Sequence, residues 1–181
     1  MRKLLYLFPI TMALAMAEHE SLAGSPENTL YMDLEYGRVV IEMRSDLAPN
    51  HVSRIKELVR LGFYDGVVFH RVIDGFMAQG GDPTGTGTGG SGENIDAEFS
   101  NAVHVRGTLS MARAQNPNSA DSQFFICFAD VPHLDGQYTV WGQVIKGMEH
   151  VDKIKRGAPQ NNGLVENPDK IIRMQIASDL E

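Results

Sequence analysis

Hydrophobic and polar positions partly alternate in the first long patterned stretch of the chain. The alternation runs over residues 30–36, stops at Gly37 and resumes over 38–43. A period of two places apolar side chains on one face of an extended strand, and a glycine between two such runs marks a turn. The pattern therefore predicts a β-hairpin here.

After Pro49 the period changes from two to between three and four. Apolar residues now recur at helical spacing, at Val52, Ile55, Leu58 and Val59. Charged residues lie between them, as on the exposed side of an amphipathic helix. Pro49 suits the first helical turn, Asp46 or Ser45 suits the N-cap, and Gly62 suits the end. We expect one helix from Pro49 to about Gly62.

The remaining apolar runs predict six more short strands and a second, short helix. The strands are expected over 67–73, 76–80, 107–111, 124–128, 139–145 and 171–177, and the helix over 148–155. The segment from Gly80 to Gly92 contains seven of the 18 glycines and is expected to be a long loop. Many short strands with two helices in one domain favour a β-barrel or a sandwich with helical plugs.

Composition narrows the function classes. The chain has 181 residues, 43% of them hydrophobic, and a net charge of −7. This is typical of one globular domain and not of a disordered chain. The acidic balance argues against a nucleic-acid binder, which needs a basic face. A single cysteine excludes an intrachain disulfide framework and a multi-cysteine metal site.

The N-terminus has the three parts of a secretory signal. Arg2 and Lys3 precede an apolar run over 4–17, which ends in small residues before Glu18. We expect a signal peptide over 1–17, a flexible polar leader over 18–28 and one folded domain over 29–181. An uncleaved membrane anchor and a buried first helix remain alternatives, although the run is shorter than the about 20 residues of a membrane span.

The sequence lacks the motifs of nucleotide, metal, cysteine and serine chemistry. The glycine-rich loop has no lysine and no helix after it, so we expect no nucleotide site. The six histidines do not cluster, so we expect neither a metal centre nor a cofactor. Cys127 lies in an apolar run and is expected to be buried and unreactive. Ser91 lacks the context of a nucleophile elbow.

Arg71 is the unusual polar residue of the predicted strands. In an alternating strand it shares a face with Phe69 and Ile73. Burying a guanidinium costs several kcal/mol unless it is paired with an acceptor or has a function that requires its burial. Two interpretations stay open at this point: a surface strand with Arg71 in solvent, or a functional arginine in an apolar groove.

Four ordered sequence blocks around Arg71 carry a family resemblance. They are FHRVIDGFMAQGGD over 69–82, GTLSMA over 107–112, SQFFI over 122–126, and LDG to VWGQV over 134–144. Together they resemble the cyclophilin-type peptidyl-prolyl cis-trans isomerases, and the resemblance covers about residues 30–177. We identify the chain as similar to the bacterial exported type. The resemblance implies a mainly β fold, a closed eight-stranded antiparallel β-barrel capped by two α-helices.

The resemblance also implies an activity, a site and a location. The activity is rotation about X–Pro peptide bonds of proline-containing polypeptides, which assists protein folding, and a periplasmic location is expected. The alternative is a peptide-binding module or holdase chaperone with incidental catalysis. Arg71 matches the catalytic arginine. Substrate-binding positions are matched by His70, Phe76, Met77, Gln79, Ala112, Arg113, Ala114, Gln123, Phe125, His133, Leu134 and Tyr138.

The sequence departs from the familiar eukaryotic pattern of this family at four places. Arg113 stands where many members have Asn, and the segment 115–121 is one residue longer. His133 replaces a Trp of cyclosporin-sensitive members, and Tyr138 replaces a frequent His. The first of these two changes removes an indole N–H donor. We therefore expect weak cyclosporin binding with activity retained, a monomer, no nucleic-acid partner, and no stable membrane insertion after signal cleavage.

Overall fold

The computed structural model describes residues 24–180. Eight strands make up its sheet, namely Thr29–Leu34 (β1), Gly37–Met43 (β2), Arg71–Ile73 (β3), Met77–Gly80 (β4), Thr108–Met111 (β5), Phe124–Cys127 (β6), Val140–Lys146 (β7) and Arg173–Ile176 (β8). Two α-helices accompany them, Pro49–Arg60 (α1) and Met148–Val151 (α2). The fold is mainly β, as predicted.

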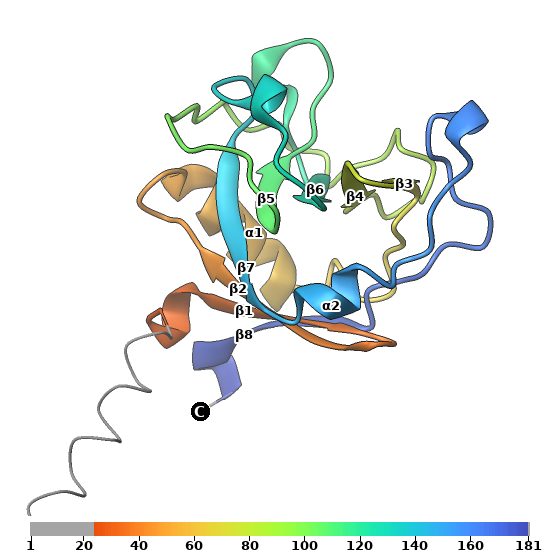
Figure 1. Cartoon of the computed structure of the whole chain (residues 1–181). Coiled ribbons are helices and arrows are strands. Elements are labelled where there is room, and N and C mark those ends of the chain that lie inside the picture. Colours follow the sequence, from red (N-terminus) through yellow and green to blue (C-terminus); the bar gives the residue numbers. More distant parts are fainter. Residues whose placement is uncertain (1–23, 181) are drawn as a thin grey trace, which may run out of the picture.

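The strands form one antiparallel sheet in the order β3-β4-β6-β5-β7-β2-β1-β8, which curls into a half-barrel (Figure 1). The prediction of a closed barrel is wrong. Between the edge strands β3 and β8, the described chain makes only isolated bridges, such as Val68 to Lys170. The segment opposite β3 cannot run as a regular strand, because Asn162 and Asn167 have positive φ and Pro168 lacks an N–H.

The hairpin and the first helix occur where the sequence pattern predicts them. β1 and β2 pair from Thr29–Glu42 to Leu34–Gly37. α1 begins at Pro49, and Gly62 follows it with φ +67°. The predicted side-chain cap is wrong, because the N-cap is Ala48 and both carboxylate oxygens of Asp46 accept from Arg44 at 2.7 and 2.8 Å.

Three other elements are shorter than predicted. The strand expected over 67–73 is reduced to β3, the closing strand to β8, and the second helix to the single turn α2. Beyond α2, Ile154 donates its backbone N–H to Val151, three residues back, and no longer four as in an α-helix. Apolar periodicity thus identifies these segments but overestimates their regular length.

Strand alternation divides the apolar residues into two clusters. Neighbouring side chains of β6 point to opposite faces, so Phe124 joins the main core and Phe125 joins a smaller one. In the main core, Phe124 lies edge-on to Tyr64 and Trp141, both with ring centroids 5.7 Å away. The smaller cluster has five buried members, Met77, Phe125, Cys127, Val131 and Leu134.

Cys127 belongs to this smaller cluster and is buried, as predicted. Burial raises the pKa of its thiol to about 12, with a smaller contribution from the charge of Asp135. The thiol is therefore un-ionised at neutral pH and does not provide a nucleophile.

The chain ends lie side by side in the described part of the fold (Figure 1). Glu27 accepts hydrogen bonds at 2.8 Å from Lys56 of α1 and from Ser178 near the C-terminus. These two bonds, the one from Lys56 first, lower the pKa of Glu27 to about 2. The predicted signal peptide and the first part of the predicted leader lie outside the described residues, so the division at 17 and 28 stays a prediction.

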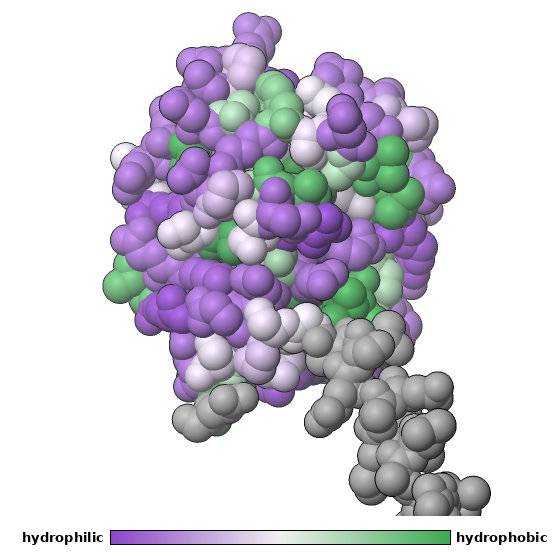
Figure 2. All heavy atoms as spheres, turned by 90° about the vertical axis from the view of Figure 1, so that its left-hand side faces the viewer, coloured by the Kyte–Doolittle hydropathy of each residue, from purple (hydrophilic) through white to green (hydrophobic). Residues whose placement is uncertain are grey.

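One face of the molecule is mostly hydrophilic, with apolar side chains in small separate patches (Figure 2). Among residues 24–180, no helix combines the length and the apolar character needed to cross a membrane.

Candidate active site

A small hollow opens over the second apolar cluster. It has a volume of about 190 Å³. Its lining consists of Arg71, Phe76, Met77, Gln79, Ala112, Arg113, Phe125, Leu134 and Tyr138. Four of these, Phe76, Met77, Phe125 and Leu134, provide apolar walls. The hollow, which we call the apolar pocket, suits a small apolar ring with a charged group beside it.

Strand register brings the polar and apolar parts of this pocket together. Arg71 of β3 pairs with Gln79 of β4, and Gln79 pairs with Phe125 of β6. Phe125 in turn pairs with Ser110 of β5. Residues directly opposite one another in a sheet project from the same face. The four therefore form one row across the sheet, although they are far apart in the sequence.

The Arg71 side chain is held by two neighbours. Its Nη1 donates to Gln79 Oε1 at 3.1 Å, its Nε donates to the Asn162 carbonyl at 3.0 Å, and its Nη2 donates to Asn162 Oδ1 at 3.1 Å. Burial lowers the pKa of Arg71 from its usual value, and Tyr138 opposes this change. An arginine remains protonated even so. The interpretation of Arg71 as a residue pointing freely into solvent is therefore wrong.

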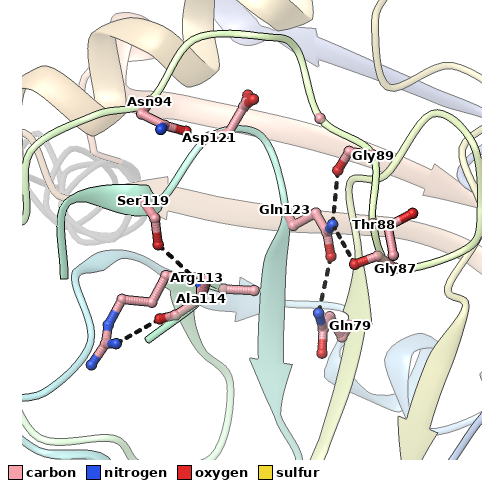
Figure 3. Close-up of a pocket in the computed structure, with 12 residues that line it drawn as sticks. Gln79, Gly87, Thr88, Gly89, Asn94, Arg113, Ala114, Ser119, Asp121 and Gln123 are labelled. Atoms are coloured by element: carbon pink, nitrogen blue, oxygen red, sulfur yellow. Dashed lines mark hydrogen bonds between the residues drawn. The ribbon is translucent and has the colours of Figure 1, made fainter. Parts of the chain in front are cut away.

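Gln79 is itself positioned by a chain of hydrogen bonds from the glycine-rich loop (Figure 3). Its Nε2 donates to Gln123 Oε1 at 3.0 Å, and Gln123 Nε2 donates to the carbonyls of Gly87 and Gly89 at 3.1 and 2.8 Å. The loop thus has a structural function here and orients two amides that lead to Arg71.

Asp82 anchors this loop. Its buried carboxylate accepts backbone N–H groups of Thr84, Thr86, Gly87 and Gly89 at 2.6–3.1 Å. Burial alone would raise the pKa of Asp82, but these bonds and that from the Thr84 hydroxyl outweigh it and hold the pKa well below its usual range. The carboxylate therefore stays charged.

A second hollow of about 360 Å³ adjoins the apolar pocket. Gln79, Ala112 and Arg113 line both. The rest of its lining is polar or small, namely Gly87, Thr88, Gly89, Gly90, Asn94, Ala114, Ser119, Asp121 and Gln123. Two further predicted site residues, Ala114 and Gln123, therefore lie here. Figure 3 shows Ala114 and Ser119 on one side and Gly87–Gly89 on the other.

The two predicted histidines line neither hollow. His133 is exposed, and its ring centroid lies 5.7 Å from that of Phe76, at the rim of the apolar pocket. His70 is 4% exposed, and neither ring nitrogen has a hydrogen-bond partner within the described chain. A role for these two residues in substrate binding stays a prediction.

Sequence reasoning missed residues that support the site from behind. One is Asn162, which holds Arg71. Another is His104, whose ring stacks on Phe125 with centroids 6.3 Å apart. The nitrogens of His104 pair with Asp135 Oδ1 at 2.9 Å and Ser110 Oγ at 2.8 Å. The Asn162–Gly163 dipeptide signals a turn, but no sequence signal indicates that it reaches Arg71.

His70 gives a prediction about pH. Burial lowers the pKa of His70, with a smaller contribution from Arg71. The unfolded chain therefore binds more protons below about pH 6.5, so this contribution to stability is complete above that pH and falls as pH drops through it. We expect the wild type to lose stability from pH 7.5 to 5, by at most about 1.4 kcal/mol per pH unit from this group, and His70→Gln to lose less.

Urea unfolding at pH 7.5, 6 and 5 measures this slope. His133→Gln, which removes an exposed histidine, is the matched control. An unchanged slope in His70→Gln would contradict the prediction.

Comparison with known proteins agrees with this geometry. The family model "Cyclophilin type peptidyl-prolyl cis-trans isomerase/CLD" matches residues 29–176. A probable peptidyl-prolyl cis-trans isomerase of Brucella suis is 56% identical over 169 residues, which cover 87% of this chain and 86% of the relative. A peptidyl-prolyl cis-trans isomerase of Helicobacter pylori is 48% identical over 125 residues, covering 67% and 76% respectively.

Solved structures give the same result. Cyclophilin AquaCyp293 from Hirschia baltica has a TM-score of 0.77 at 29% identity, over 87% of this chain and 76% of that one. A Cryptosporidium parvum cyclophilin, crystallised in the presence of the dipeptide Ala-Pro, has a TM-score of 0.75 at 32% identity, over 82% and 98%. The chain thus has peptidyl-prolyl cis-trans isomerase activity, and it belongs to the cyclophilin-type peptidyl-prolyl cis-trans isomerase family.

Proposed function

We propose that Arg71 is the catalytic group, and that the apolar pocket holds the proline ring of the substrate while the preceding peptide unit rotates. The observation that carries this proposal is the guanidinium fixed by Gln79 and Asn162 at the edge of a pocket with four apolar walls. The substrate is a proline-containing polypeptide.

The chemistry needs no covalent step. The barrier to rotation about an X–Pro bond is about 18–20 kcal/mol, because the bond has partial double-bond character. At the twisted transition state this conjugation is lost, and the proline nitrogen gains a free lone pair. A guanidinium N–H that donates to this lone pair binds the twisted state better than either planar isomer, which is differential transition-state binding.

The hydrogen bonds of Arg71 leave donors for this task. A guanidinium has five N–H groups. Three of them are used within the described chain, toward Gln79 and Asn162. The two others, one on each Nη, remain for a substrate. Because the side chain is already oriented, little conformational entropy is lost when the transition state forms.

The required acceleration is consistent with one charged donor in a partly desolvated site. Uncatalysed isomerisation takes tens of seconds. A millisecond event needs about four orders of magnitude, which corresponds to about 5–6 kcal/mol. A single preorganised donor contributes about 2.7–4 kcal/mol in comparable cases, and desolvation of the peptide bond in the apolar pocket supplies the rest.

The test is an NMR exchange or protease-coupled assay on an X–Pro peptide. Wild-type protein should accelerate interconversion well above the spontaneous rate, with saturation by peptide. Interconversion at the spontaneous rate would overturn the proposal. The same experiment addresses the holdase alternative, because a holdase would suppress aggregation of a proline-free unfolded client without accelerating exchange.

We also propose that the protein is exported and acts on folding polypeptides in the periplasm. The support is the basic start at Arg2 and Lys3, the apolar run over 4–17 and the small residues before Glu18. N-terminal sequencing of the protein from a periplasmic extract should begin at Glu18. A cytoplasmic protein that retains its apolar run would contradict export.

Weak cyclosporin binding is a further proposal. His133 is exposed at the rim of the apolar pocket and offers no indole N–H donor. We expect inhibition only above micromolar cyclosporin, and His133→Trp should bind it at least about tenfold more tightly. Titration of the isomerase assay with cyclosporin measures both, and nanomolar inhibition of the wild type would contradict the proposal.

A further inference from the structure

Arg113 places a second positive charge at the mouth of the apolar pocket. It lies two residues after the end of β5 and lines both hollows. Its side chain turns away from Gln123 and the glycine-rich loop (Figure 3). Its guanidinium carbon lies 4.7 Å from the centroid of Tyr138, which itself lines the apolar pocket. The charge therefore stands over the Tyr138 ring at the mouth of the pocket.

Backbone carbonyls fix this guanidinium in place. Nε and Nη2 donate to the Gln137 carbonyl at 3.3 and 2.9 Å, and Nη1 donates to the carbonyls of Ala114 and Gln115 at 2.8 and 3.2 Å. One Nη2 N–H remains free of these bonds, since a guanidinium carries five donors. The carbonyls orient the group but do not neutralise its charge.

No carboxylate of the described chain neutralises Arg113. Six other arginines form ion pairs with Asp or Glu within 4.0 Å, namely Arg38, Arg44, Arg54, Arg60, Arg106 and Arg156. Arg113 has no such partner in residues 24–180. In a protein with a net charge of −7, this leaves one positive charge without an ion-pair partner beside the pocket. A fixed, unpaired charge at a binding site attracts the opposite charge on a ligand.

We propose that Arg113 is a specificity-determining residue, which favours substrates with an Asp or Glu side chain within two positions of the proline. This proposal rests on the proposed site, because the proline in the apolar pocket places its neighbours beside Arg113. The competing interpretation is a structural brace, in which Arg113 only holds the carbonyls of Ala114, Gln115 and Gln137. A brace affects all substrates equally, whereas a specificity residue changes their ratio.

The experiment compares kcat/KM for X–Pro peptides with Glu, Gln or Lys at each of the two positions before and the two after the proline. At one position or more, the wild type should prefer Glu to Lys about fivefold, equal to about 1 kcal/mol. Arg113→Gln should abolish this preference and Arg113→Glu should reverse it. Arg44→Gln, which removes a paired surface arginine, should retain it.

A second test of the charge preference varies the salt concentration and needs only the wild-type protein. The wild-type preference should shrink at 0.5 M NaCl, because the charges are partly exposed and screened. Two results would overturn the proposal: no position at which the wild type prefers Glu to Lys, or an unchanged preference in a folded Arg113→Glu. If instead no peptide of the series is isomerised faster than spontaneously by the wild type, the proposed function itself fails.

Discussion

Replacing Arg71 by alanine should lower kcat/KM for X–Pro isomerisation by about a hundredfold, or about 2.7 kcal/mol of transition-state stabilisation. The variant removes the two guanidinium donors that are not used by Gln79 and Asn162. The wall residues of the apolar pocket remain, so the proline ring can still bind. Coupled-protease kinetics on a Suc-Ala-X-Pro-type peptide would measure the loss.

Two matched variants show whether this loss is specific to the guanidinium of Arg71. Arg71→Lys keeps a positive charge but replaces the planar fork of five N–H donors by one compact ammonium, so its activity should fall between wild type and Arg71→Ala. Arg38→Ala removes an exposed arginine that pairs with Asp33 on the hairpin, and kcat/KM should not change. Activity of Arg71→Ala within twofold of the wild type would contradict a catalytic role.

Replacing Phe125 by alanine should lower kcat/KM by about thirtyfold, mostly through a higher KM, because the largest buried wall of the apolar pocket disappears. Phe125 is 5% exposed and also contacts Tyr138, with centroids 5.7 Å apart at 83°, and His104. Loss of a buried Phe side chain costs about 3 kcal/mol of stability. Urea unfolding and kinetics at a temperature where the variant is folded measure the two effects.

A matched phenylalanine separates stability from binding. Phe63 packs against the main core and lines neither hollow, so Phe63→Ala should lose stability but keep kcat/KM while folded. Phe125→Leu, which restores most of the apolar contact, should recover part of the activity. Equal kinetic losses in Phe63→Ala and Phe125→Ala would show that the pocket wall has no specific role.

The sequence predicts those parts of the fold that depend on local periodicity. The β1–β2 hairpin has one buried face, and α1 has a long apolar stripe. Each periodic pattern extends over many residues, so a single atypical residue does not hide it. Closure of the barrel is a different matter. It depends on whether segment 162–172 can form a ladder with 67–73, and two asparagines with positive φ and one proline prevent this.

The sequence likewise predicts some residues of the site and not others. The row of Arg71, Gln79 and Phe125 follows from motif residues on neighbouring strands, and the family resemblance indicates it. The contact between Arg71 and Asn162 joins positions 91 residues apart, and that between His104 and Asp135 joins positions 31 apart. Such contacts depend on how loops return to the sheet, which no local pattern encodes.

We expect Arg71 to stabilise the twisted transition state and not the bound peptide. One NMR sample of Arg71→Ala with an Ala-Pro peptide tests it, because line shapes along a titration give both the Kd and the cis–trans exchange rate of the bound peptide. We predict that the exchange rate falls about a hundredfold while the Kd changes less than threefold. A Kd that weakens as much as the catalytic efficiency falls, with unchanged exchange of the bound peptide, would contradict a role of Arg71 in the transition state.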